Sequence, residues 1–112
     1  MGKIAKKWEY KDQTDPKYGK CTEAADEMER YLQKNKLHGA LIELEWNPRS
    51  TSIIGSRSAG KRVSDNGYHV GVLYDGKVYC NVHPDGFVKQ TWIDDFYILN
   101  PPATKTVREI SF

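Results

Sequence analysis

The sequence predicts an α+β fold, in which one amphipathic helix precedes a largely antiparallel sheet. Apolar residues recur at helical spacing from Cys21 onward, and after Gly39 the chain changes to short alternating runs separated by Gly and Pro. The length of 112 residues suits one domain with a modest core. We therefore expect a single domain with an entry segment 1–18, a core 19–100 and a tail 101–112.

The first two elements follow from their patterns. Residues 1–18 show no clear period and are expected to wrap the surface. A helix is predicted from Cys21, with acidic side chains in its first turns, lysines near its end, and stop signals at Asn35 and Gly39. The run Ala40–Trp46 alternates apolar residues with Glu, which predicts a strand with one solvated face. The apolar positions of the helix are Cys21, Ala24, Ala25, Met28, Tyr31 and Leu32.

The segment Arg49–Asn66 is rich in Ser, Gly, Arg and Lys and is predicted to be a long loop, functional or mobile. Only Ile53–Ile54 suggests a short strand within it. Beyond residue 86 we expect a strand or turn at 87–92, a short helix at 93–96, a short strand at 97–99 and an edge strand within 104–112.

The segment Gly67–Gly86 is predicted to be a β-hairpin, because two runs rich in Val and Tyr flank an Asp-Gly pair. A three-residue loop would place Val70 opposite Cys80 and His69 opposite Asn81. A two-residue loop would place Val70 opposite Asn81 and mix apolar with polar groups. Burial of one face only would favour the three-residue loop, with His69 beside Asn81 on the open face.

Composition limits the function. The charged fraction of 29% and hydrophobic fraction of 38% are typical of folded soluble domains. A net charge of +2 is too small to require nucleic acid, although positive charge gathers in residues 1–20 and 47–66. The longest apolar run, Ala40–Ile42, is too short to span a membrane, and no signal-peptide core follows the basic start. No membrane association is expected.

Cys21 is the candidate nucleophile. A thiol at a helix N-terminus lies near unpaired backbone N–H groups, which favour the thiolate and can stabilise an oxyanion, and Lys20 adds positive charge. An amide bonded to one ring nitrogen of His69 would leave the other nitrogen as a base. Cys80 is expected on the apolar face, away from His69 and inert. A small buried core thiol is the alternative role of Cys21.

The group that orients the histidine is open among Asn81, His83 and Asp85. Pairing of the strands favours Asn81, whereas Asp85 lies in a Pro-Asp-Gly sequence that suits a turn. The cysteines are not expected to form a disulfide, and neither His38 nor His83 has metal-ligand spacing. No metal and no cofactor are predicted. Trp46 and Trp92 are expected in the core or as cleft walls.

Several of these segments together resemble the papain-fold toxin family, which consists of small domains at the C-termini of bacterial polymorphic toxins. The resemblance covers about residues 17–96 and implies a papain-like fold with Cys21, His69 and Asn81 as catalytic triad. The matching segments are Gly19-Lys20-Cys21 with Ala24-Ala25, the helix end Leu37–Ala40, the strand Gly67–Val72, the strand Val78–Gly86, and Trp92.

The resemblance also implies a function. The domain would be a secreted antibacterial effector, carried at the C-terminus of a parent polymorphic toxin, acting in the cytoplasm of the target cell and neutralised in the producer by an immunity protein. The expected reaction is on an amide or acyl bond, as protease, deamidase or acyl transferase, with protein favoured over RNA as substrate. A toxin nuclease on the same scaffold, with His69 as base, and a non-catalytic interaction domain are the alternatives.

Overall fold

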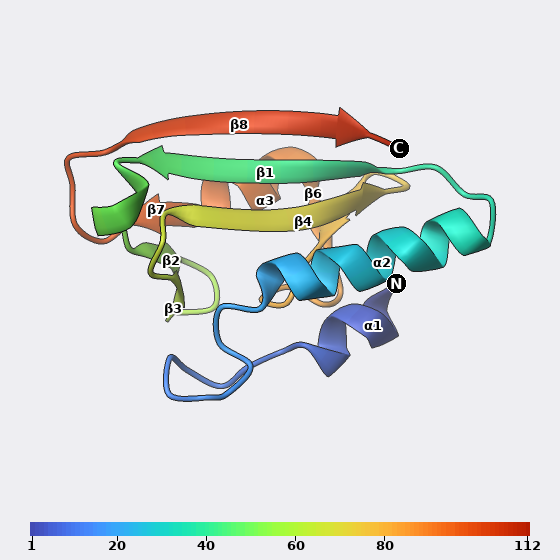
Figure 1. The fold of residues 1–112 in the computed structure, drawn as a ribbon, viewed down its shortest axis with the longest axis horizontal. Coiled ribbons are helices and arrows are strands. Elements are labelled where there is room, and N and C mark those ends of the chain that lie inside the picture. The colour runs from blue at the N-terminus through green and yellow to red at the C-terminus, as the bar shows by residue number, and fades with distance from the viewer.

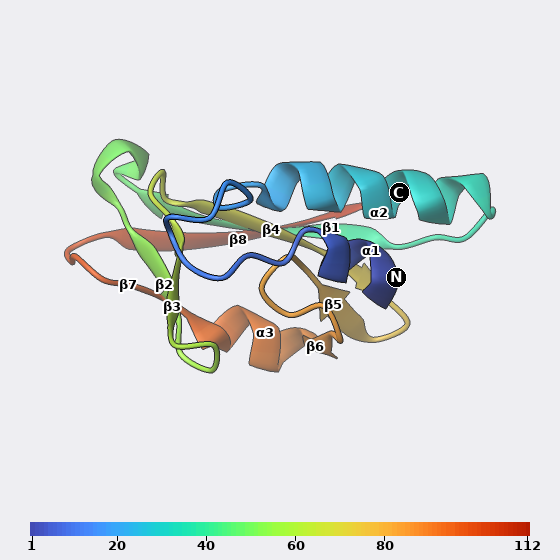
Figure 2. The same ribbon diagram turned by 90° about the horizontal axis from the view of Figure 1, so that it is seen from below.

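The computed structural model describes residues 1–112 and shows a central antiparallel sheet with helices on both sides (Figures 1 and 2). The sheet has five strands in the order β6-β5-β4-β1-β8, and β2, β3 and β7 form a second, three-stranded sheet. The predicted α+β class is confirmed. The helices are α1 (Gly2–Lys7), α2 (Cys21–Lys34) and α3 (Lys89–Asp95), with a 3-10 turn η1 (Arg49–Thr51). The strands are β1 (Ala40–Asn47), β2 (Ile54–Ser56), β3 (Lys61–Ser64), β4 (Tyr68–Tyr74), β5 (Lys77–Tyr79), β6 (Phe87–Val88), β7 (Phe96–Ile98) and β8 (Thr104–Ser111).

The predicted helix is present as α2, and its apolar stripe covers β4. Met28 and Leu32 are fully buried against Val70 and Val72 of that strand. The entry segment is more ordered than its sequence predicted, because it contains α1 and buries Ala5. Lys7 pairs with Glu27 of α2 at 2.8 Å, which fixes α1 beside α2. No helix is long and apolar enough to cross a bilayer.

Both faces of the central sheet are covered, α2 lying on one and α3 on the other (Figure 2). Because side chains alternate along a strand, Val70 and Val72 of β4 face α2 while Gly71 faces the opposite side. A Cβ atom on Gly71 would lie 2.8 Å from the ring of Trp92 in α3, so only glycine allows this close approach. Trp92 and Trp46 are core residues, as expected.

The predicted hairpin register is wrong by one residue. Val72 pairs with Tyr79 and Tyr74 with Lys77, which leaves a two-residue turn of Asp75 and Gly76. Both turn residues have positive φ, 51° and 82°, as a type I′ turn requires, and that turn matches the twist of paired strands. The three-residue loop rested on burial of one face only, and here α3 buries the second face as well.

The segment Arg49–Asn66 is not a simple loop. It contains η1, β2 and β3, and β2 pairs with both β3 and β7 in the second sheet. Further along, the helix predicted at 93–96 begins already at Lys89, so 87–92 is mostly helical. The tail forms β8, which pairs along the whole of β1 at the sheet edge, as expected.

Candidate active site

Cys21 is the first residue of α2 and lies against β4. The residue is 8% exposed, and its sulfur lies close enough to Val70 and Thr22 for their donor groups to favour the thiolate. The N-cap residue, Lys20, contributes no side-chain cap, so the N–H groups of the first turn are left to other partners. The sulfur therefore sits where donors from a helix start and a strand converge.

The protonation of Cys21 differs from the expectation. Burial raises the pKa of the thiol, and the hydrogen bonds from Val70 and Thr22 offset only part of that rise. The ammonium of Lys20 lies 3.4 Å from the carboxylate of Glu23, so its charge is partly neutralised by that pair. The predicted shift toward thiolate is wrong for this conformation, because desolvation outweighs the favourable donors.

A pocket of about 200 Å³ gives the thiol an opening to the surface. The hydroxyl of Tyr18 donates to Asp65 at 2.8 Å on its wall. Asn66 accepts from Ser64 and from the backbone of Tyr68, which holds the segment before β4. The pocket is lined by Tyr18, Gly19, Cys21, Thr22, Ser64, Asp65, Asn66 and Tyr68. A small acyl group could approach the sulfur through this opening.

His69 lies on the other face of the sheet. Its neighbours Tyr68 and Val70 face α2, so alternation turns His69 toward α3. The imidazole is completely buried, with its ring centroid 5.6 Å from that of Trp92 and 4.5 Å from that of Phe96. Neither ring nitrogen has a hydrogen-bond partner. The expected contacts of His69 with Cys21 and Asn81 are therefore absent.

The surroundings of His69 also change its titration. Burial lowers the pKa of the imidazole to about 3, and the charge of His83 adds to that effect. A base with this pKa stays neutral at physiological pH. In this conformation the imidazole is available neither to orient nor to deprotonate the thiol.

Asn81 and Cys80 follow the end of β5 and are both buried. The side-chain carbonyl of Asn81 has no hydrogen-bond partner. The indole N–H of Trp92 donates to the sulfur of Cys80 at 3.3 Å, and burial raises the pKa of that thiol to about 11. Cys80 was expected on the face away from His69, but both residues contact Trp92. The cause is the one-residue change of register.

A cluster that the sequence did not reveal lies around His83. Its Nε2 is 2.7 Å from Asp95, and the hydroxyl of Ser56 donates to the same carboxylate at 2.6 Å. The backbone N–H of Ser58 donates to the other carboxylate oxygen at 2.8 Å. Burial raises the pKa of Asp95, but the hydrogen bonds from Ser56, His83 and Ser58 outweigh it and hold the pKa low.

This cluster is not a hydrolytic triad. In such a triad the carboxylate holds one ring nitrogen and the nucleophile contacts the other. Here the Nε2 of His83 faces both Asp95 and, at 3.5 Å, the hydroxyl of Ser56. The cluster ties β2, α3 and the segment after β5 together. Asp85, by contrast, lies in a turn closed by a hydrogen bond from Gly86 to His83, as predicted.

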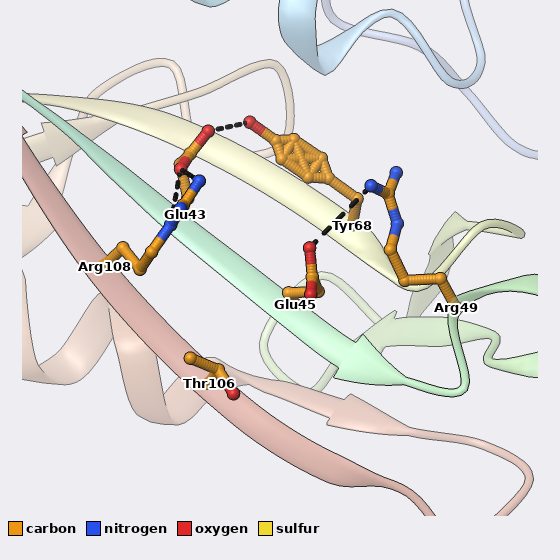
Figure 3. A pocket seen from close by; sticks show the side chains of 6 residues that line it. All are labelled: Glu43, Glu45, Arg49, Tyr68, Thr106 and Arg108. Carbon is orange, nitrogen blue, oxygen red and sulfur yellow. Dashed lines mark hydrogen bonds and ion pairs between the residues drawn. The ribbon is translucent and has the colours of Figure 1, made fainter.

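A second hollow, of about 450 Å³, lies beside the first on the α2 side of the sheet (Figure 3). The hydroxyl of Tyr68 donates to Glu43 at 2.5 Å, and Arg108 donates to the same carboxylate at 2.5 and 3.1 Å. It is lined by Glu43, Glu45, Arg49, Tyr68, Thr106 and Arg108. Tyr68 lines both hollows, so the two adjoin. No sequence signal predicted this pocket, because its residues come from three strands and a 3-10 turn.

A cysteine at the start of a helix that packs on an antiparallel sheet is the arrangement of a papain-like domain. Comparison with known families agrees. The papain fold toxin 2 family matches residues 4–97, most of the chain, and the protein belongs to this family. No curated protein and no solved structure matches the chain. The predicted family is thus confirmed, whereas the catalytic roles of Cys21, His69 and Asn81 stay predictions.

Proposed function

We propose that this toxin domain uses Cys21 to attack an amide or acyl carbon of a protein in the cytoplasm of a target bacterium. The observation that supports the proposal is the position of the thiol, at a helix start, near the donor groups of Val70 and Thr22 and beside an open pocket. The sulfur bonds to the carbonyl carbon, the leaving group departs with a proton, and water or an amine resolves the thioester. The choice of water or amine distinguishes hydrolysis from acyl transfer.

The proposal assigns His69 as base and Asn81 as orienting amide only after a rearrangement. His69 must move from the α3 face to the α2 face, and its unpartnered nitrogens lower the cost of leaving its present site. Without this movement, the thiol loses its proton to solvent. The two routes differ in pH dependence, since solvent deprotonation follows the raised pKa of Cys21 alone, whereas a histidine partner adds a reactive population at lower pH.

The test combines growth with intact-mass labelling. Expression of the domain in a bacterial host should arrest growth, and Cys21→Ser should abolish the arrest while Cys80→Ser preserves it. Iodoacetamide at pH 7.5 should label Cys21 at least about tenfold faster than Cys80, because Cys80 is 1% exposed whereas Cys21 borders an open pocket. Equal labelling of both thiols, or full toxicity of Cys21→Ser, would overturn the proposal. His69→Ala then shows whether the low-pH reactivity depends on the histidine.

A protein substrate is preferred to RNA because two basic residues of segment 47–66 that a nuclease would use, Arg57 and Lys61, already have partners. Arg57 stacks on Tyr97, with 4.6 Å between the guanidinium and the ring centroid. Lys61 donates to the backbone carbonyl of Tyr10. Side chains held in this way are poorly placed to grip phosphates. A nuclease would tolerate Cys21→Ser, and a non-catalytic interaction domain would show no chemistry with either variant.

The proposed partners are a parent toxin chain N-terminal to this domain, which delivers it by secretion, and a cognate immunity protein. An acidic immunity protein suits the positive charge of segments 1–20 and 47–66. Its association rate should fall several-fold between 50 and 500 mM salt, with a smaller change in dissociation. Salt-independent association measured by surface plasmon resonance would place the partner on another surface.

A further inference from the structure

The pocket beside Cys21 adjoins the charged hollow, whose side chains Figure 3 shows. Tyr68 lines both hollows, and Arg49 of the charged hollow donates to the backbone carbonyl of Asn66, which lines the cysteine pocket. Helix α2 lies over β4, while β1 and β8 extend beyond it on this side (Figure 1). The two hollows therefore adjoin at Tyr68, and the charged hollow extends from there over β1 and β8.

Within the charged hollow, called here the arginine pocket, the side chain of Glu43 lies deeper than that of Arg108. The side chain of Glu43 is 17% exposed and that of Arg108 is 66% exposed. The second pair is less tight, with Arg49 3.7 Å from Glu45. A carboxylate that accepts hydrogen bonds from an arginine orients the guanidinium group without using all of its N–H donors. Glu43 thus holds the guanidinium group of Arg108 toward solvent, while that of Arg49 packs over the ring of Tyr68.

The unused hydrogen-bonding groups of the arginine pocket are mostly donors. Arg108 binds Glu43 through Nε and Nη2, which leaves Nη1 free. Arg49 donates from Nε to the carbonyl of Asn66, and its Nη2 makes no hydrogen bond. Thr106 adds a free hydroxyl. A planar carboxylate can accept from these donors in pairs, and a single negative charge is repelled less by the two glutamates than a phosphate dianion would be.

We propose that the arginine pocket takes an acidic side chain of a polypeptide substrate whose carbonyl carbon is presented to Cys21. This inference rests on the proposed role of Cys21. The register supports the geometry, because Val70, which packs beside Cys21, pairs with Glu43, and Glu43 pairs with Arg108. Two strand spacings amount to about 10 Å, and an extended peptide advances about 3.4 Å per residue. The acidic residue should therefore lie two or three residues from the attacked carbonyl.

Peptides that carry an electrophile test this directly. Chloroacetyl-Gly-Glu-Gly-amide and chloroacetyl-Gly-Gly-Glu-amide would be compared with their Gln analogues, and the rate of Cys21 alkylation followed by intact mass at low salt. Chloride leaves as the thiolate sulfur bonds to the methylene carbon, and the thiol proton goes to solvent. At least one Glu peptide should react about fivefold faster than its Gln analogue, and high salt should reduce the ratio.

Three variants identify the site. Arg108→Gln and Arg49→Gln should bring the Glu/Gln ratio to about one, while Arg30→Gln, an exposed arginine on α2, should leave it unchanged. The ratio cancels any general change in thiol reactivity. A ratio near one in the unmodified protein, a ratio unaffected by both pocket variants, or a faster reaction with a phosphoserine peptide would overturn the inference. If 2-chloroacetamide and all the peptides fail to alkylate Cys21, the proposed function fails instead.

Discussion

The polar side chains on the two faces of the central sheet lie in different environments. On the α2 side, Cys21, Glu43 and Arg108 border hollows that open to solvent. On the α3 side, His69 and His83 are both buried near the ring of Phe96, yet only His83 has hydrogen-bond partners. His83 binds Asp95 at 2.7 Å, whereas neither nitrogen of His69 has a partner. Burial alone therefore does not reveal whether a polar residue stabilises the fold.

The largest expected effect concerns the cluster around His83. Asp95→Ala should lower the free energy of unfolding by about 3 kcal/mol, because it leaves His83 and the hydroxyl of Ser56 buried without their carboxylate partner. Urea denaturation at pH 7.5 measures the change. Asp94→Ala is the matched control on the same helix, because Asp94 is exposed, and it should cost less than about 0.5 kcal/mol. Equal losses for the two variants would show that the cluster is not a structural tie.

The second prediction concerns the pH dependence of the free energy of unfolding, to which the buried His69 contributes. Its pKa is lowered by burial to about 3 in the folded protein, whereas the unfolded chain titrates near about 6.5. Between these pH values His69 binds a proton in the unfolded chain but not in the folded protein. Its contribution to the free energy of unfolding is therefore fully present above about pH 6.5 and is lost as the pH falls. From pH 6.5 to 5 the expected loss is about 2 kcal/mol.

The control for this prediction is a second histidine. His69→Leu should remove the loss of stability between pH 6.5 and 5, and His38→Leu, at an exposed position, should keep it. Denaturation series at both pH values measure the difference. A pH dependence that survives in His69→Leu would mean that another group carries it, and the buried state of His69 would be in question.

How far the sequence predicts this structure depends on the kind of signal. The helix at Cys21, the strand at Ala40 and the edge strand near the end follow from periodicity and turn residues, which are local. The hairpin register failed because it depends on whether one face or both are buried, which α3 decides from outside the hairpin. The second sheet in Arg49–Asn66 was missed because its strands are short and pair with β7, distant in the sequence.

The site residues also divide into those placed by one element and those placed by the packing of several elements. The place of Cys21 at a helix start was predictable, since it depends on one helix. The position of His69 relative to Cys21 was not, because it depends on α2 packing on the Val70 and Val72 face of β4 while Trp92 and Phe96 cover the opposite face. The cluster around His83 and the arginine pocket join residues from several elements, and no spacing in the sequence marks them.

The smallest expected effect tests why His69 is buried without partners. At pH 7.5, His69→Leu should raise the free energy of unfolding by about 1 kcal/mol, because removal of an unbonded buried imidazole outweighs the loss of its contacts with Trp92 and Phe96. His83→Leu, the matched change at the engaged histidine, should be destabilising by more than that, because Asp95 loses its partner. Thermal and urea unfolding measure both changes.

If His69→Leu is more stable but no longer toxic, His69 is needed for activity although it destabilises the fold. That result favours the rearranged triad. If His69→Leu is less stable, the contacts of the imidazole with Trp92 and Phe96 outweigh the cost of its unpartnered nitrogens.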